Sequence, residues 1–291
     1  MLSLDEKKIR KGKPIGLPYQ GSKKKISKKI IEIIKQNFGT DKSIYDIFGG
    51  GGAITAECIL NGLEVYYNDL DKDITNAFER VISQDREWIK TLIISREEFL
   101  EIKAKENKTT DDFLKLLINS FGNKKANYMY NKEISDLKYN LAKEIIKKHD
   151  VFSGYKQTET FKKVISNTKQ ENDKVFKQLQ QLEQLQRLQQ LDEVKATNKS
   201  YHTFSDVSGA VLYLDPPYEG SYQKSYINSF DSQEFYDWAF EIAKTNIVII
   251  SSYSISDERF EVVYSFDKAR STLEGGTRND KCEKLFMVKN S

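Results

Sequence analysis

The chain has 291 residues, of which 38% are hydrophobic and 31% are charged, and a formal net charge of +3. These values are typical of a soluble globular protein with one large domain or two ordinary ones. No apolar run approaches the roughly 20 residues that span a bilayer, and the basic N-terminus lacks the apolar segment of a signal peptide. Two histidines and two cysteines, without metal-ligand spacing, predict a cytoplasmic protein with no metal site.

Ten lysines and arginines lie between Lys7 and Lys29, in the first predicted segment. Such a run is typical of a solvated face or a loose tail, and equally of a patch that faces nucleic-acid phosphates. The sequence leaves both interpretations open.

Alternating strands and helices follow. The pattern predicts a strand at 43–48, a helix at 54–62, a strand at 63–69 and a helix at 72–82. The first strand runs into four glycines, which allow a sharp turn and a close approach of a ligand to the main chain. Asp69 ends the second strand, where acids of nucleotide-binding sheets hold ribose hydroxyls. The glycines could be needed only for a tight turn. Together with the acid they predict nucleotide-type binding. The motif of a P-loop is not present.

The amino-acid composition changes between residues 84 and 199, where glycine is sparse and proline is absent. Helices are expected at 113–121, 136–148 and 175–194. The last carries five leucines at a spacing of three, which sweep about 240° around a helix and do not form a coiled-coil seam. We expect a helix buried on several sides, with low complexity as the alternative.

After residue 200 strands are expected at 209–215, 246–254, 259–266 and 284–289, with a helix at 232–244. This alternation favours a largely parallel α/β sheet. We therefore predict one domain from residues 1–83 plus 200–291 and a second, helical domain at 84–199.

The segment LYLDPPY, residues 212–218, ends a predicted buried strand on two prolines. Neither proline can donate to a ladder, so the strand stops and Asp215 lies at the carboxyl edge of the sheet. Its carboxylate and a proline carbonyl are fixed acceptors for the two hydrogens of an amino group, and Tyr218 offers a ring that can stack on a base. The alternative is a plain turn with a capping aspartate.

An exocyclic base amine is a poor nucleophile because its lone pair is delocalised into the ring. Acceptors for both N–H hydrogens turn that lone pair toward an electrophile such as a methyl sulfonium. A base within a duplex reaches such a pocket only when it is flipped out.

Four motifs occur in a fixed order: PYQGSK (18–23), DIFGGGGA (46–53), YNDLD (67–71) and DPPY (215–218). With the helical insertion before the last, the chain resembles the Dam-type DNA adenine-N6 methyltransferases, particularly those of phages and prophages. The resemblance covers nearly the whole chain. It implies a Rossmann-like, S-adenosylmethionine (SAM)-dependent methyltransferase sheet with an inserted target-recognition domain.

The resemblance also implies roles for individual residues. Asp215, Pro216, Pro217 and Tyr218 would be catalytic, with Asp215 between SAM and the target amine. The expected SAM contacts are Tyr19 and Lys23, the backbone around Phe48, Gly49 and Gly51 for the methionine portion, Asp69 for the ribose and Asp206 near the adenine. Residues 250–254 resemble the strand that lines the flipped-base pocket.

The expected partner is double-stranded DNA, bound by a monomer. Basic residues of segment 119–131 and Arg270, Arg278 and Lys281 are candidates for phosphate contacts, the last three on a hairpin predicted at 270–286. Because the basic residues of 119–131 are placed differently from those of the family, GATC specificity is not predicted.

Three alternatives stay open at this point. The same motif serves amino methyltransferases that act on cytosine N4 or on guanine N2 of RNA, although the cytosine enzymes more often carry serine in place of the aspartate. A DNA-binding relative that has lost catalysis is the third, and the intact DPPY motif counts against it.

Overall fold

The computed structural model describes residues 1–289 except 20, 167–175, 192–193, 220–229 and 267–281. Its centre is a seven-stranded sheet in the order β3-β2-β1-β4-β5-β7-β6. The strands are β1 (Ile44–Asp46), β2 (Val65–Asn68), β3 (Ala196–Thr197), β4 (Val211–Leu214), β5 (Ile247–Ser252), β6 (Phe260–Ser265) and β7 (Lys284–Val288). The first five run parallel, and β7 lies antiparallel between β5 and β6. The predicted α/β sheet is confirmed.

Helices pack on both faces of this sheet. Side chains of a strand alternate between its two faces, so Val211 and Tyr213 of β4 join a core with α1 and α2, while Leu212 and Leu214 join a core with α10. The helices of the described residues are α1 (Ser27–Phe38), α2 (Ala53–Leu60), α3 (Lys72–Ile82), α4 (Arg86–Lys90), α5 (Arg96–Ala104), α6 (Thr110–Ile118), α7 (Ser135–His149), α8 (Glu159–Ser166), α9 (Lys177–Leu188) and α10 (Ser232–Ile242).

The strand order creates a switch point between β1 and β4. From β1 the chain moves outward to β2 and β3, and then returns to β4 on the other side of β1. In open α/β sheets ligands bind in the crevice outside the carboxyl ends of the strands at such a point. The glycine turn follows β1 and Asp215 follows β4, so both flank this crevice.

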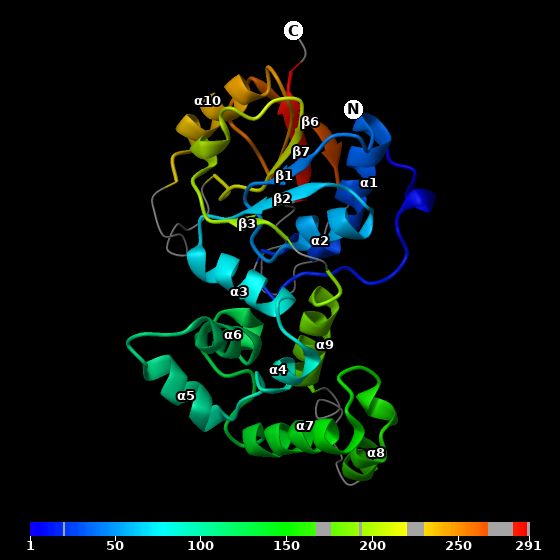
Figure 1. The fold of residues 1–291 in the computed structure, drawn as a ribbon, viewed down its shortest axis with the longest axis vertical. Helices are drawn as coiled ribbons and strands as arrows, with labels where there is room; N and C mark the ends of the chain where they lie inside the picture. The colour runs from blue at the N-terminus through cyan, green and yellow to red at the C-terminus, as the bar shows by residue number, and fades with distance from the viewer. Residues whose placement is uncertain (20, 167–175, 192–193, 220–229, 267–281, 290–291) are drawn as a thin grey trace.

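Helices α4 to α9 gather at one end of the molecule, beyond α3 (Figure 1). One apolar cluster joins this helical part to the sheet domain, since it contains Ile74 and Phe78 of α3 together with the leucines of α9. The chain has returned to the sheet at Ala196, where β3 begins. The division into two domains stays a prediction.

The leucines of α9 are buried on several sides, as the spacing predicts. Leu179, Leu182, Leu185 and Leu188 are 0% exposed and Leu191, beyond the helix, is 6% exposed. They face α3, α4, α6 and α7. The low-complexity interpretation is wrong for this helix.

Part of the basic N-terminal run is tied to the fold. The Arg10 guanidinium donates to both carboxylate oxygens of the buried Glu57 in α2, at 2.8 and 2.9 Å. Lys24 Nζ donates to Gln184 Oε1 of α9 at 2.5 Å. The loose-tail interpretation is therefore wrong for these residues, and a patch that faces phosphates stays a prediction for the run.

Candidate active site

Side chains from several segments meet at the carboxyl edge of the sheet. The glycine turn 49–52 follows β1, Asp69 follows β2, Asp215 follows β4 and Tyr253 follows β5. Since β7 is antiparallel to these strands, its first residues lie at the same edge, and Glu283 directly precedes it. Topology therefore brings acids from distant parts of the chain together.

Asp215 binds a lysine that lies 192 residues earlier in the chain. Lys23 Nζ is 2.6 and 2.7 Å from the two Asp215 oxygens and 2.5 Å from the Tyr218 hydroxyl. The Lys23 side chain is 9% exposed and that of Asp215 is 17% exposed, so the pair is largely shielded from water. The structure thus brings three of the predicted site residues together, with Lys23 on the DPPY carboxylate.

The protonation states follow from the surroundings. Burial lowers the pKa of Lys23, but attraction by Asp215 and Glu283 outweighs it and the net pKa is raised, so the ammonium persists at neutral pH. Burial raises the pKa of Asp215, and the Lys23 ammonium opposes this. Burial, and then the charges of Asp215 and Glu283, raise the pKa of Tyr218 far above its ordinary value, so its hydroxyl keeps the proton.

Glu283 belongs to the same group, although the sequence did not single it out. The Tyr218 hydroxyl donates to Glu283 Oε1 at 2.8 Å, and Ser251 Oγ donates to the same oxygen at 2.8 Å. Lys23 Nζ is 3.8 Å from Glu283. The sequence could have indicated Glu283 if the last strand had been expected to pair antiparallel with 246–254. That pairing places residue 283 beside the end of β5.

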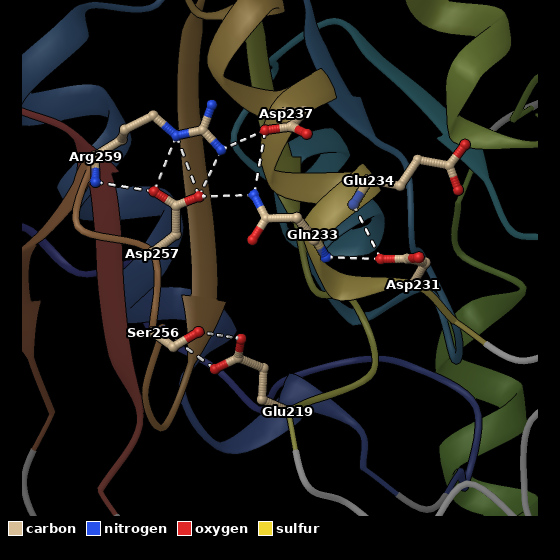
Figure 2. A network of polar contacts seen from close by, with 8 residues as sticks. All are labelled: Glu219, Asp231, Gln233, Glu234, Asp237, Ser256, Asp257 and Arg259. Carbon is tan, nitrogen blue, oxygen red and sulfur yellow. Dashed lines mark hydrogen bonds and ion pairs between the residues drawn. The ribbon is translucent and has the colours of Figure 1, made fainter.

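The DPPY segment is held against the loop that follows β5. The rings of Tyr218 and Tyr253 pack edge to face, with centroids 4.7 Å apart. One residue on, the Glu219 carboxylate accepts from the Ser256 backbone N–H at 3.1 Å and from its hydroxyl at 2.7 Å (Figure 2). Tyr253 belongs to the segment 250–254 that was predicted to line the base pocket, and it lies beside Tyr218.

A hollow of about 430 Å³ opens beside this segment. It is lined by Glu219, Phe230, Asp231, Ser232 and Gln233. Phe230 packs on the ring of Phe48, with centroids 6.3 Å apart, and Phe48 directly precedes the glycine turn. The hollow therefore lies at the edge of the sheet that carries the switch point, next to the predicted SAM contacts.

The acid after β2 is bound to the glycine turn. Asp69 Oδ2 accepts from the Gly50 backbone N–H at 2.7 Å, and Oδ1 accepts from that of Asp71 at 2.8 Å. Burial, only partly offset by these bonds, raises the pKa of Asp69 to about 6. Each carboxylate oxygen can accept a further hydrogen bond, so the group suits a pair of ribose hydroxyls.

Two of the glycines are required by internal packing. A Cβ on Gly49 would lie 2.3 Å from the Tyr67 ring, and one on Gly52, whose φ is +70°, would lie 2.2 Å from the Phe78 ring. A Cβ on Gly51 would lie 3.1 Å from the Tyr19 Cβ, so Tyr19 covers the turn. The fold alone thus explains glycine at 49 and 52, and the contact of the turn with SAM stays a prediction.

Asp46, the last residue of β1, is a further buried acid beneath this turn. It is 1% exposed, and its Oδ2 accepts from the Thr55 backbone N–H at 3.1 Å and from the Thr55 hydroxyl at 2.7 Å. Burial outweighs these bonds and raises the pKa of Asp46 to about 7. The side chain therefore keeps its proton in the folded protein at pH values where an unfolded chain has lost it.

This shift predicts a pH dependence of stability. Between about pH 4 and pH 7 the folded state binds a proton at Asp46 that the unfolded state releases, so the free energy of unfolding falls as the pH rises, by at most about 4 kcal/mol. The Asp46→Asn variant should lose this part of the slope in urea titrations at pH 5 and pH 7.5. Asp69 contributes to the slope of both proteins, so the difference isolates Asp46. Equal slopes would contradict the prediction.

Comparison with known proteins gives the family. Residues 19–280 match the model of the D12 class N6 adenine-specific DNA methyltransferases. The chain belongs to this family. It is therefore an adenine-specific DNA methyltransferase.

No curated protein matches this DNA methyltransferase. Among solved structures it is similar to a protein from Haemophilus influenzae described as a methylase, with 10% identity, a TM-score of 0.34, and coverage of 94% of this chain and 92% of the other. It is also similar to the rRNA methyltransferase AviRa from Streptomyces viridochromogenes, with 10% identity, a TM-score of 0.34, and coverage of 90% and 84%. These likenesses are too distant to add to the family assignment.

One predicted site residue of the methyltransferase lies elsewhere. Asp206 is exposed and precedes β4, whereas Asp215 follows it. Gly209, between Asp206 and the strand, bonds to Thr245 just before β5, which is the amino edge of the sheet. A strand of four residues spans about 13 Å, so Asp206 is not brought to the group around Asp215.

Several further expectations concern absent or undescribed features. Arg270, Arg278 and Lys281 and the tip of the predicted hairpin lie outside the described residues. In the part of the chain that the structure describes, no helix is long and apolar enough to cross a membrane. The same part contains no group of three His, Cys, Asp or Glu side chains that could hold a metal ion.

Proposed function

We propose that this methyltransferase transfers the methyl group of SAM to N6 of an adenine flipped out of duplex DNA. The reacting edge would be Asp215, Pro216, Pro217 and Tyr218. The observation that carries the proposal is the Asp215 carboxylate, held by Lys23 at the carboxyl end of β4, at the switch point of the sheet. A base within the helix does not reach such a site, which is the reason for flipping.

The residues of this edge would act on the target amine. The Asp215 carboxylate and the Pro216 carbonyl would accept its two hydrogens, so that the lone pair of the nitrogen turns away from the ring. SAM, when bound, supplies a methyl group on a positively charged sulfur. The nitrogen gains positive charge as it gains the methyl group, and the Asp215 carboxylate stabilises that charge and is the nearest acceptor for the proton that leaves.

The described residues fit SAM at the neighbouring strand ends. Asp69 has acceptor capacity for the ribose hydroxyls, and Tyr19 covers the glycine turn on which the methionine portion would lie. Phe230 lines the hollow of about 430 Å³ beside the DPPY segment, and Phe48 packs on Phe230. We propose that the adenine of SAM contacts the rings of Phe48 and Phe230, rather than Asp206.

DNA would approach over segment 119–131. Burial lowers the pKa of its Lys125 ammonium, and the charges of Asp71 and Asp73 oppose this only in part. The segment therefore lies close to the start of α3, at the edge that carries Asp69. Phe121 in this segment is 55% exposed. We propose that its lysines contact phosphates while the enzyme acts as a monomer on DNA in the cytoplasm of a bacterial or phage-infected cell.

The test is methyl transfer from labelled SAM to duplex DNA that lacks adenine methylation, with RNA as a parallel substrate. We expect label in the DNA, recovered as N6-methyladenine after hydrolysis. Single-molecule sequencing of DNA from cells that express the protein would then give the recognition sequence. Label in N4-methylcytosine or in RNA would overturn the proposal.

A further inference from the structure

Glu283 has no part in the chemistry described so far, yet it is bound both by β5 and by the segment that follows β4. Its carboxylate accepts from the Tyr218 hydroxyl, at 2.8 and 3.1 Å to the two oxygens, and from Ser251 Oγ at 2.8 Å. The side chain is 13% exposed, and Ser251 of β5 is 0% exposed. Removing a carboxylate from water costs free energy unless hydrogen bonds compensate. The partners of Glu283 supply those hydrogen bonds and also fix the position of its carboxylate.

The Tyr218 hydroxyl has one proton to donate, and the distances show where it goes. Glu283 Oε1 is 2.8 Å away and Asp215 Oδ1 is 3.3 Å away. The proton therefore goes to Glu283, while the hydroxyl oxygen accepts from Lys23 at 2.5 Å. As a result Tyr218 does not consume an acceptor position on Asp215, which stays open to the target amine.

Lys23 lies between the two carboxylates. Two of its three hydrogens go to Asp215 and the third goes to Tyr218, while a Glu283 oxygen at 3.8 Å attracts the ammonium without a direct bond. Two carboxylates and one ammonium leave one excess negative charge. That excess favours the positive charge that the target nitrogen acquires.

We propose that Glu283 is a positioning residue for methyl transfer: it holds the Tyr218 hydroxyl and, together with Asp215, the Lys23 ammonium, and thereby fixes the Asp215 carboxylate toward the target amine. This inference rests on the proposed function of Asp215. It assigns a role to the residue that directly precedes β7, far from the recognised motifs of the family.

The first test is kinetic. Glu283→Ala should lower kcat for DNA methylation roughly 100-fold, because the loss of its hold on Tyr218 and Lys23 misplaces Asp215, with a smaller effect on KM. Glu283→Gln keeps an oxygen acceptor for Tyr218 and should lose less. Adding Tyr218→Phe to Glu283→Gln should cost less than the sum of the two single effects, because the two residues act through one hydrogen bond.

The second test observes Lys23 without SAM or DNA. The charged or titratable groups that face its ammonium are Asp215, Glu283, Tyr218 and Tyr253. Glu283 raises the pKa of Lys23, so Glu283→Gln should lower it, and the ¹⁵Nζ signal of Lys23 should titrate at lower pH in the free protein. The alkaline limb of the kcat profile should move in the same direction.

Glu32→Gln is the matched control. Glu32 is also a buried glutamate paired with a lysine, Lys35 Nζ at 2.9 Å, but it lies in α1 and outside the Asp215 group. This variant should change stability without moving the Lys23 titration or the pH profile.

The outcomes separate the inference from the proposed function. An unchanged kcat in Glu283→Ala, or an unshifted Lys23 titration in Glu283→Gln, overturns the positioning role while the wild type still methylates adenine. If Glu283→Ala lowers kcat only in proportion to its loss of stability, as expected for Glu32→Gln, the positioning role is also overturned. If the wild type transfers no methyl group to DNA, the proposed function fails. A shifted Lys23 titration in Glu283→Gln would even then support the interaction between Glu283 and the Lys23 ammonium.

Discussion

The Asp215→Ala variant should lose methyl transfer to adenine almost completely, with kcat lowered on the order of 1000-fold or more. The removed carboxylate is the preorganised acceptor for the target amine, and loss of a single group of this kind typically costs 100- to 1000-fold, roughly, in kcat. Here the variant also releases the Lys23 ammonium, which donates two of its hydrogen bonds to Asp215. The measurement is single-turnover methyl transfer from labelled SAM at saturating DNA.

DNA retention should survive in this variant, because Asp215 would contact the flipped base and SAM but no phosphate, whereas phosphate contacts supply most of the affinity. Electrophoretic mobility shifts at matched salt concentrations test this. Asp257→Ala is the control: it removes a salt-bridged aspartate whose side chain is 7% exposed, with Arg259 Nη2 at 2.5 Å, and which is not in contact with Asp215, Lys23 or Tyr218. Transfer that survives in Asp215→Ala, or fails equally in Asp257→Ala, would remove the basis for the catalytic assignment.

Gly52→Ala should be among the most destabilising single substitutions in the sheet domain, by roughly 3 kcal/mol or more. Its φ of +70° disfavours a side chain, and the new Cβ would lie 2.2 Å from the Phe78 ring. That ring cannot move cheaply, since Phe78 is fully buried and stacks on Tyr67 with centroids 4.7 Å apart. Urea unfolding at a fixed pH gives the free energy of unfolding.

Gly62→Ala isolates the backbone part of this cost. Gly62 has a similar φ of +72°, but a Cβ there would meet nothing within 4 Å. We expect a loss of about 1 to 2 kcal/mol at this position. Equal losses at positions 52 and 62 would show that the contact with Phe78 contributes nothing.

The helix α1 shows how a local signal can be missed. The ten lysines and arginines between Lys7 and Lys29 predict a basic run, and the sequence pattern predicts no helix there. The described helix buries Ile30, Ile31, Ile33 and Ile34 against the sheet while its lysines lie outside the core. The apolar spacing of these isoleucines was present in the sequence, and the density of charge hid it.

Asp206 is predicted to lie near the adenine of SAM, and the structure places it before β4 rather than after it. A residue that precedes a strand lies at the amino end of that strand, and ligands of parallel sheets bind at the carboxyl end. The length of β4 therefore separates Asp206 from Asp215.

The sequence by itself determined the strand ends and the acids that they carry. The two prolines lack N–H groups, so β4 ends directly before Asp215, and the glycines after β1 permit a tight turn. Both effects act between neighbouring residues and do not depend on distant parts of the chain. The tertiary structure alone decided which charges meet. Lys23 reaches Asp215 across 192 residues, and Glu283 joins them because β7 inserts antiparallel beside β5. Such pairings depend on how the strands are ordered in space, a property that local spacing along the chain does not encode.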